Sequence, residues 1–441
     1  MIRLSEHFDY RKLLRYSFPS IIMLIFTAIY GVVDGFFVSN FVGKTAFTAV
    51  NFIMPVLMIL GCIGFMFGTG GGALIAKTVG EGGLKKANQI FSMLVYVSFI
   101  AGVVLGVLGI IFMRPVAMAL GADGRLLNDS VLYGRVFLVG IPMYILQYEF
   151  QCLFATAEKP QLGLYITVAA GLTNMVLDAL FVAVFKWGLI GAAAATVLSQ
   201  CVGGIIPIIY FALPNSSLLK ITKPVFDGKA LIKICTNGSS ELMSNISMSL
   251  VSMLYNIELL KCAGENGVAA YGVLMYLNMI FQSAFVGYSV GAAPIISYHF
   301  GADNSKELKN LMKRSFIIIS IFAIGMFIFS EAMARPLSLL FVGYDKELFE
   351  ITLRAFFIYS FSYLFSGFSI FSSSFFTALN DGPVSAMISF LRTLVFQVVA
   401  VLFFSAVWKL DGIWFSIVFA EVMAVIVSGL FLVCKQKKYK Y

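Results

Sequence analysis

The sequence predicts an all-α integral membrane protein with twelve transmembrane helices in two six-helix bundles. Two observations lead to this fold class: a very apolar composition, and an internal repeat that divides the chain into similar halves. Hydrophobic residues make up 60% of the 441 residues, charged residues make up 12%, and the mean hydropathy is +0.93. A soluble domain carries roughly 25% charged residues. We therefore expect most of the chain to lie in a lipid bilayer.

Stretches long enough to cross the membrane occur six times in each half. A helix needs about 20 mostly apolar residues to cross about 30 Å of hydrocarbon. The stretches cover 17–39, 49–76, 90–111, 131–155, 162–184 and 188–212, then 237–260, 268–297, 315–334, 351–375, 385–407 and 411–433. These runs are continuous, whereas the strands of a membrane β-barrel are ~10-residue segments of alternating polarity. Helices are therefore expected.

The two halves match at a constant offset of 221 residues. Identical pairs at this offset include Gly43 and Gly264, Gly70 and Gly291, Gly80 and Gly301, and Trp187 and Trp408. Because each half has an even number of spans, both halves enter the membrane in the same direction, and the repeat is parallel. The expected organisation is an N-terminal lobe at 1–212, a cytoplasmic linker at 213–236, a C-terminal lobe at 237–434 and a basic tail at 435–441.

The distribution of basic residues predicts the orientation. Of the 31 Lys and Arg residues, 20 fall on the side of the amino terminus and ten on the opposite side, while Arg392 lies within a span. Cytoplasmic loops carry the excess of Lys and Arg, so both termini are expected in the cytoplasm and the protein in the cytoplasmic membrane. The net charge of +9 is then explained by the basic residues of the cytoplasmic loops. Because the basic residues lie in short loops, no nucleic-acid partner is expected.

Neither an enzyme nor a nucleotide-driven pump is expected. The six cysteines are scattered singly and only two histidines occur, His7 and His299, so the sequence lacks the clustered ligands of a catalytic metal site. The glycine-rich run 70–78 resembles a phosphate-binding loop, but Ala76 stands where a glycine must precede the Lys-Thr pair. Energy is therefore expected from an ion gradient.

Ionisable residues within the spans are the candidates for chemistry, because each costs about 2.5–3.5 kcal/mol to insert. They are Asp34, Glu149, Asp178, Glu241, Glu258, Arg392 and Glu421. Glu149, Arg392 and Glu421 are candidates for ion pairs between helices, with partners that the sequence does not assign.

Two of the acids are expected at the same depth in the first lobe. At about 1.5 Å per residue, Asp34 and Asp178 lie ~25 Å and ~24 Å from the starts of their spans. Asn174 precedes Asp178 by four residues and shares its helix face. The span 188–212 runs in the opposite direction and brings Ala192 and Thr196 to the same height. An all-oxygen set of this kind suits Na⁺, and equally a carboxylate pair that holds a proton.

The repeat indicates that this site belongs to the N-terminal lobe alone. At the offset of 221, the positions of Asp34, Asn174, Asp178 and Thr196 are occupied by Tyr255, Val395, Val399 and Ile417. None of these four residues carries the polar group of its counterpart. Oxygens with only an architectural role would be expected in both lobes.

These residues resemble the multidrug and toxic compound extrusion (MATE) family over essentially the whole chain. The resemblance rests on Pro19, on the run Val33-Asp34-Gly35-Phe36-Phe37-Val38, and on the Asn174/Asp178 pair with Thr196. The run 266–272 resembles the MepA-like bacterial branch. The family resemblance implies that Asp34, Asn174, Asp178, Thr196 and the Ala192 carbonyl bind the coupling ion, Na⁺ or H⁺, with no other cofactor.

The resemblance also suggests residues around the substrate. Tyr133 and Gln151 match the aromatic and amide positions of the family's fourth span, although Gln151 replaces an asparagine. Further candidates for the cavity are Gln147, Glu241 and Gln282. Ser247 stands where some members have an acid, so a cation site in the second lobe is not expected.

The implied function is that of a monomeric, cation-coupled antiporter that exports amphipathic, mostly cationic organic compounds. The alternative is a flippase for lipid-linked precursors from the same wider superfamily. Such a flippase is expected to need several Arg and Lys residues in its cavity to bind pyrophosphate. Arg392 is the one basic residue within a span, which favours the antiporter.

Overall fold

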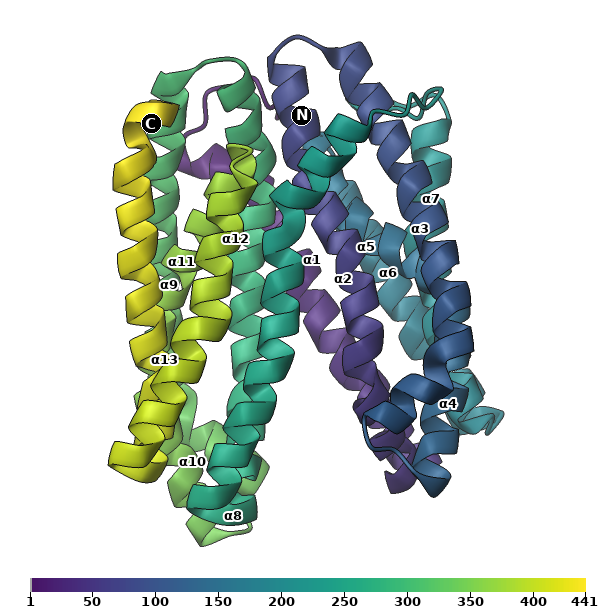
Figure 1. Ribbon diagram of the computed structural model, residues 1–441, viewed down its shortest axis with the longest axis vertical. Helices are drawn as coiled ribbons and strands as arrows, with labels where there is room; N and C mark the ends of the chain where they lie inside the picture. Colours follow the sequence, from purple (N-terminus) through teal and green to yellow (C-terminus); the bar gives the residue numbers. More distant parts are fainter. Residues whose placement is uncertain (1) are drawn as a thin grey trace.

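The chain forms a two-lobed bundle of membrane-spanning helices (Figure 1). The computed structural model describes residues 2–441, and that range contains helices and loops but no strand. Nine of these helices are long and apolar enough to cross a membrane, and a bent pair makes a tenth. Two of the nine contain one non-helical residue each, Gly264 and Lys409, and turn back there. The described chain therefore crosses twelve times, which confirms the predicted fold class.

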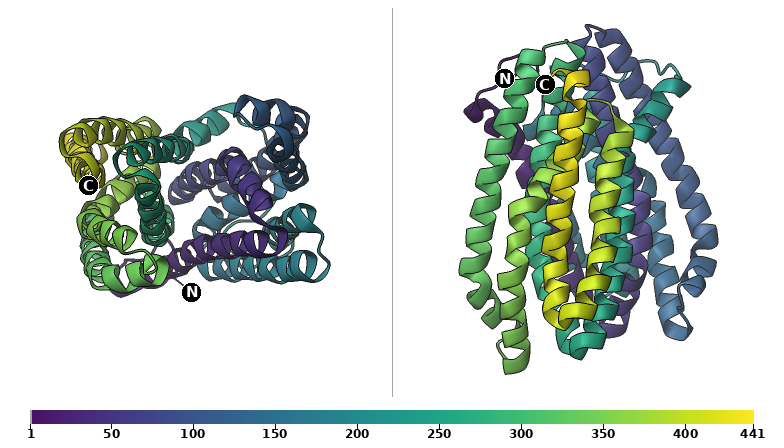
Figure 2. Two further views of the ribbon diagram at one scale, coloured as in Figure 1. Left: turned by 90° about the horizontal axis from the view of Figure 1, so that it is seen from below. Right: turned by 60° about the vertical axis from the view of Figure 1, so that its left-hand side comes forward.

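The N-terminal lobe consists of seven α-helices and two π-helical segments. They are α1 (Tyr10–Phe37), η1 (Val38–Val42), α2 (Lys44–Gly80), α3 (Leu84–Ala119), α4 (Gly124–Val139), α5 (Ile141–Thr156), α6 (Pro160–Asp178), η2 (Ala179–Val184) and α7 (Gly188–Ala212). Helix α1 begins beside the C-terminal lobe and then runs along α6 (Figure 2). This helix is therefore in a position to connect the two lobes.

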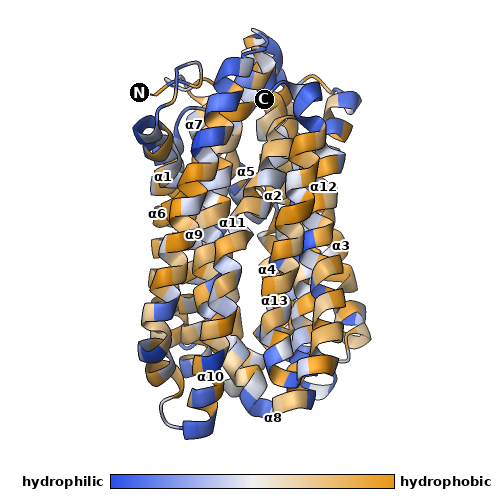
Figure 3. Cartoon of the chain, turned by 90° about the vertical axis from the view of Figure 1, so that its left-hand side faces the viewer, coloured by the Kyte–Doolittle hydropathy of each residue, from blue (hydrophilic) through white to orange (hydrophobic). Residues whose placement is uncertain are grey.

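The C-terminal lobe repeats this arrangement. It contains α8 (Gly228–Gly301), α9 (Ser305–Val342), α10 (Lys346–Tyr359), the 3₁₀ turn η3 (Ser360–Ser362), α11 (Tyr363–Ala378), α12 (Gly382–Phe390), the π-helical η4 (Leu391–Val395) and α13 (Phe396–Tyr439). Both termini lie at one end of the molecule (Figure 1). Apolar residues dominate the middle of the helices, and hydrophilic residues gather toward the two ends (Figure 3). An apolar middle between two hydrophilic ends matches the hydrocarbon core and the two polar faces of a bilayer.

The internal repeat extends to the backbone of the turns. Gly43, between the first two crossings, has φ of +113°, and its counterpart Gly264, where α8 turns back, has φ of +60°. Gly188 at the start of α7 has φ of +61°, and its counterpart Lys409 has φ of +52°. Left-handed conformations are readily adopted by glycine and are uncommon for lysine. The same reversals thus occur at equivalent positions of both lobes.

Three expectations from the sequence differ from the structure. The predicted span 131–155 is broken: α4 and α5 meet at an angle of 61°. Gly140 ends α4 and Pro142 lies in the first turn of α5, where its missing N–H is tolerated. The linker predicted at 213–236 ends at residue 227, because Asp227 caps α8 by accepting hydrogen bonds from the Lys229 and Ala230 amides.

The third difference concerns the basic tail predicted at 435–441. Helix α13 continues to Tyr439, and Tyr441 is 1% exposed and packs in the core of the C-terminal lobe. The Tyr441 hydroxyl donates to the Leu432 carbonyl. The lysines of this segment suggest a solvated tail, but the aromatic rings among them are apolar enough to anchor it.

Candidate ion-binding site in the N-terminal lobe

Both candidate carboxylates lie where an α-helix passes into a π-helix. Asp34 is in the last turn of α1, just before η1, and Asp178 is the last residue of α6, just before η2. Single π-helical turns within α-helices occur frequently at functional sites. The π-helical segments therefore begin beside the same two residues that were candidates because of their charge within a span.

The structure brings the predicted residues together. Asp34 is 7% exposed and Asp178 is fully buried, and their carboxyl groups lie within interaction distance of each other. Asn174 is buried one turn before Asp178 on α6. Tyr133 of α4 reaches the same centre, with its hydroxyl near Thr196 and both carboxylates. Side chains from α1, α4, α6 and α7 thus converge on one buried point.

The polar atoms at this point lack protein partners. Among the described residues, the buried atoms without a hydrogen bond include Asp34 Oδ1, both carboxylate oxygens of Asp178, both amide atoms of Asn174 and the Tyr133 hydroxyl. Unpaired polar atoms in the interior are rare and costly. A bound cation or proton would satisfy the oxygens, so the residues present fit either ion.

Ala192 and Thr196 are hydrogen-bonded to each other on α7, which the sequence analysis did not predict. The Thr196 hydroxyl donates to the Ala192 carbonyl over 3.0 Å. The carbonyl expected to bind an ion therefore already accepts one hydrogen bond, although a carbonyl oxygen has two lone pairs.

Two further residues of the site were missed in the sequence analysis. Tyr30 lies one turn before Asp34 on α1 and interacts with Asp34 and Gln147. Gln200 lies one turn after Thr196 on α7, is 2% exposed, and has no partner for either amide atom within the part of the chain that the structure describes. The i, i+4 spacing from residues already identified was the signal that could have found both.

Helix α5 lines the N-terminal lobe with amides and a carboxylate. Gln147 and Gln151, both predicted, are buried, and Gln151 has no partner for either amide atom among the residues described. Glu149 is fully buried and lies near Ser98 of α3, and its carboxylate oxygens have neither a hydrogen-bond partner nor an ion-pair partner among residues 2–441 as described.

In the C-terminal lobe, the counterpart of Asp34 and the charged residues Arg392 and Glu421 have side-chain partners. Tyr255, the counterpart of Asp34, donates to Gln397 and also bonds Ser416, with both distances 2.8 Å. Arg392 in η4 forms a forked ion pair with Glu421 of α13, with the shortest contact 2.9 Å. These contacts agree with an ion site confined to the first lobe.

Two of the predicted cavity residues lie around this ion pair. The Arg392 guanidinium also donates to the Gln282 side chain over 3.3 Å, so Gln282 supports the ion pair. Glu241 of α8 is half-buried and interacts electrostatically with Arg392 and with Cys62 of the N-terminal lobe. Glu241 is therefore positioned between the lobes.

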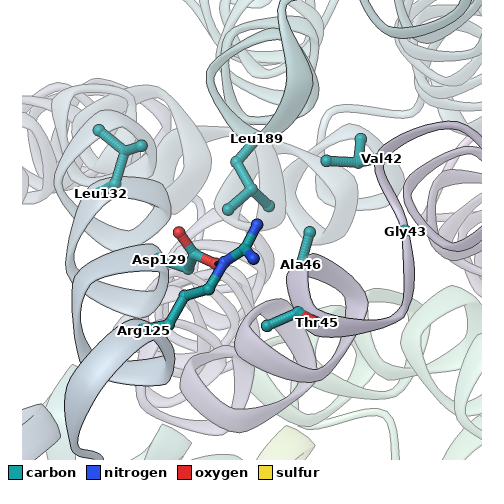
Figure 4. A pocket seen from close by; sticks show the side chains of 8 residues that line it. All are labelled: Val42, Gly43, Thr45, Ala46, Arg125, Asp129, Leu132 and Leu189. Atoms are coloured by element: carbon teal, nitrogen blue, oxygen red, sulfur yellow. Dashed lines mark ion pairs between the residues drawn. The ribbon is translucent and has the colours of Figure 1, made fainter.

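A small pocket opens where the turn between η1 and α2 meets the start of α4 and the start of α7 (Figure 4). It has a volume of about 270 Å³ and lies between Gly43, Leu189 and the ion pair of Arg125 with Asp129, whose charged atoms are 3.7 Å apart. Neither Asp34 nor Asp178 lines it. It is therefore separate from the candidate ion site.

Twelve crossings in two repeated lobes, with ionisable residues buried in their interiors, define the architecture of a membrane transporter. The MatE family model matches residues 19–180 and 242–402, one match in each lobe, and the chain belongs to this family. The family resemblance predicted from the sequence is thereby confirmed.

Curated relatives are multidrug export proteins named MepA. The protein from Staphylococcus saprophyticus subsp. saprophyticus is 24% identical over 431 residues, which cover 96% of this chain and 93% of the relative. The protein from Staphylococcus haemolyticus is 25% identical over 324 residues, covering 73% of this chain and 71% of the relative.

Solved structures share the fold. A multidrug resistance MATE family transporter in an outward-facing conformation superposes with a TM-score of 0.93 at 22% identity, covering 98% of this chain and 97% of that one. A MOP superfamily transporter from Pyrococcus furiosus, for which a reverse polarity of the binding pocket is described, gives a TM-score of 0.90 at 22% identity, with coverage of 99% and 98%.

Proposed function

We propose that this protein is an antiporter that exports amphipathic, mostly cationic organic compounds in exchange for Na⁺ or H⁺. The observation that carries the proposal is the buried Asp34/Asp178 pair, in which three carboxylate oxygens (Asp34 Oδ1 and both of Asp178) lack a hydrogen-bond partner among the described residues. An ion bound there would neutralise charge that is otherwise unfavourable in the low-dielectric interior. The two curated MepA relatives, both named multidrug export proteins, support the direction of transport.

Helix α1 offers a route from the ion site to the interface between the lobes. It carries Asp34 near one end, and near the other end Ser17 packs against Gly291 of the C-terminal lobe. Pro19 lies between them and cannot donate a backbone hydrogen bond, which makes bending easier at that position. Neutralisation of Asp34 would therefore be transmitted to the lobe interface through one helix.

The half-buried carboxylate of Glu241 is the group we assign to the cationic part of the cargo. It lies between the lobes near Cys62, and Cys62 in turn lies near the aromatic ring of Tyr148. Tyr148 packs edge-on against Phe65, with ring centres 6.0 Å apart. A carboxylate combined with aromatic rings is a favourable environment for an organic cation.

The energetics allow useful export. One charge moving inward down about 100 mV releases about 2.3 kcal/mol. A tenfold gradient of neutral cargo requires about 1.4 kcal/mol. For neutral cargo, one ion per cycle is therefore sufficient for a more than tenfold gradient, whereas a monovalent cationic cargo needs more than one inward charge per cycle to draw on the potential.

We further propose that the protein functions as a monomer in the cytoplasmic membrane with both termini in the cytoplasm. The excess of Lys and Arg at the end that carries the termini supports this orientation. The flippase alternative is disfavoured because Glu421 neutralises Arg392, which leaves little positive charge for a pyrophosphate.

Dye transport into inverted membrane vesicles, which corresponds to efflux from the cell, tests the proposal, with Na⁺ and pH gradients imposed separately. We expect one gradient to drive efflux, and Asp34→Asn and Asp178→Asn to abolish it at unchanged expression. Asp129→Asn, in the separate outer pocket, is the matched control and should retain efflux. Gradient-driven efflux by both Asp34→Asn and Asp178→Asn would contradict the coupling role, and no efflux by the wild type with either gradient would contradict antiport of the dye.

A further inference from the structure

The segment ahead of α1, residues 2–9, crosses to the C-terminal lobe. The Phe8 amide donates to Glu307 Oε1 over 3.0 Å, and the Asn310 side chain donates to the Phe8 carbonyl over 3.0 Å. His7 Nδ1 lies 2.7 Å from Glu307 Oε2. Leu4 and Phe8 are fully buried in the core of the C-terminal lobe. This segment, which we call strap A, is thus bound at the start of α9.

Strap A is also bound to the N-terminal lobe. The Leu4 amide donates to Glu158 Oε1 over 2.7 Å, and Glu158 lies in the turn between α5 and α6. One turn beyond the start of α1, the Tyr16 hydroxyl donates to the Ala155 carbonyl at the end of α5. Strap A therefore bridges the two lobes, with a glutamate as the acceptor on each side.

The linker ahead of α8 makes the corresponding crossing in the opposite direction. The Lys220 amide donates to the Asn88 side chain over 2.9 Å, and the Thr222 amide donates to the Ser92 hydroxyl over 2.8 Å. Asn88 and Ser92 lie near the start of α3, the third crossing of the N-terminal lobe, as α9 is the third crossing of the other. Residues 218–227, which we call strap B, therefore occupy the same topological position as strap A, ahead of the first helix of one lobe and bound to the third crossing of the other.

We propose that straps A and B are paired latches that hold the terminus-bearing end of the molecule closed and must release when that end opens. Each strap precedes the first helix of its own lobe and is bound to the third crossing of the other. Separation of the lobes at this end pulls the two attachment points apart. Strap A cannot keep both Glu158 and Glu307 once they separate, so its hydrogen bonds oppose opening.

Glu307 is the residue through which this latch can be weakened selectively. Its carboxylate accepts hydrogen bonds from the Phe8 amide and the Asn310 side chain, and it pairs with His7. Hydrogen bonds to a charged group are stronger than those between neutral groups. Their loss should therefore raise the population that is open at this end without touching the ion site.

Thiol labelling tests the proposal. In a background without native cysteines, Ser17→Cys places a reporter at a fully buried position where α1 meets Gly291 of the other lobe. We expect Glu307→Gln, and separately deletion of residues 2–9, to speed labelling about tenfold, the change that about 1.4 kcal/mol produces. Glu81→Gln removes a half-exposed carboxylate at the same end, outside the straps, and is expected to leave the rate unchanged.

Spin-label distances between Lys85→Cys on α3 and Lys309→Cys on α9 give a second readout. The Glu307→Gln variant should add a longer-distance population. Unchanged labelling and distances in Glu307→Gln would overturn the latch, even if the deletion variant fails to fold. Neither readout requires cargo or a coupling ion, so the result is independent of whether the proposed antiport is correct.

Discussion

Gly80 of α2 lies so close to Tyr298 of α8 that a Cβ on the glycine would be 2.1 Å from the Tyr298 carbonyl oxygen. The same contact recurs 221 residues later: a Cβ on Gly301 would be 2.1 Å from the carbonyl oxygen of Lys77. Residue pairs that exchange places in this way are the mark of a two-fold axis. The two lobes therefore meet about a pseudo-two-fold axis, as the parallel repeat predicts.

The close contact predicts that Gly80→Ala and Gly301→Ala destabilise the closed arrangement. An added methyl group at either site meets backbone, which cannot move aside as a flexible side chain can. Alanine normally favours a helix over glycine by about 1 kcal/mol, so a lower melting temperature in detergent would have to come from the contact. The control is Gly429→Ala, where a Cβ would meet nothing within 4 Å. Equal or higher stability of both Gly80→Ala and Gly301→Ala would show that the lobes tolerate a wider separation.

The ion site predicts that the coupling ion stabilises the wild type. An ion at 100 times its dissociation constant adds about 2.7 kcal/mol to the free energy of unfolding. If the ion is Na⁺, NaCl should raise the melting temperature above that in KCl of equal ionic strength, and Asp34→Asn should remove the difference. If it is H⁺, the salts should be equivalent and the Asp34→Asn variant should lose a stabilisation that the wild type gains on acidification. A sodium effect that persists in Asp34→Asn would place the ion elsewhere.

The membrane spans and the acid pair could be predicted because local rules govern them. Hydropathy over about 20 residues defines a span, and helical rise was enough to bring Asp34 and Asp178 to one depth. The break at Gly140 was missed because the apolar run continues through it. The straps could not be predicted, since Phe8 and Glu307 are almost 300 residues apart and only tertiary packing brings them together.

For the ion pair of Arg392 and Glu421, we predict that removal of one charge destabilises the protein far more than removal of both. Both side chains are mostly buried, at 15% and 5% exposed. Glu421→Gln leaves the guanidinium without its counter-charge, and breaking a buried pair in this way costs about 3–5 kcal/mol. Removal of both charges, in Arg392→Met with Glu421→Leu, should recover most of that loss. Thermal unfolding of Arg392→Met, Glu421→Leu and the double variant measures the coupling, and strictly additive effects would exclude it.

The proposed role of Glu241 predicts that loss of its charge weakens transport of cationic cargo and leaves transport of neutral cargo unchanged. Glu241→Gln keeps the shape of the side chain and removes the charge that an organic cation would meet. We expect the apparent KM for a cationic dye to rise about tenfold, equivalent to about 1.4 kcal/mol, while a neutral dye is transported as before. Glu258→Gln, which removes a carboxylate paired with Lys261 over 2.7 Å, is the matched control. An equal loss for both dyes would indicate a structural role for Glu241.

Glu158, the acceptor for strap A on the N-terminal lobe, predicts a pH dependence of stability. Burial raises the pKa of the Glu158 carboxyl above its ordinary value, and this effect exceeds the opposing one of the Leu4 N–H. A carboxyl with a raised pKa in the folded state stabilises that state fully below its unfolded pKa of about 4.3. The contribution is lost as the pH rises through the folded value.

The glutamine variant isolates this contribution because Glu158→Gln cannot titrate. The melting temperature of the wild type minus that of Glu158→Gln should therefore decrease from pH 4.5 to pH 7.5. Glu81→Gln, measured in the same series, corrects for the loss of a charge at this end of the molecule. A difference that rises with pH would mean that the charged carboxylate is the favoured form, so that the Leu4 hydrogen bond outweighs burial. Strap A would then be held most tightly at neutral pH.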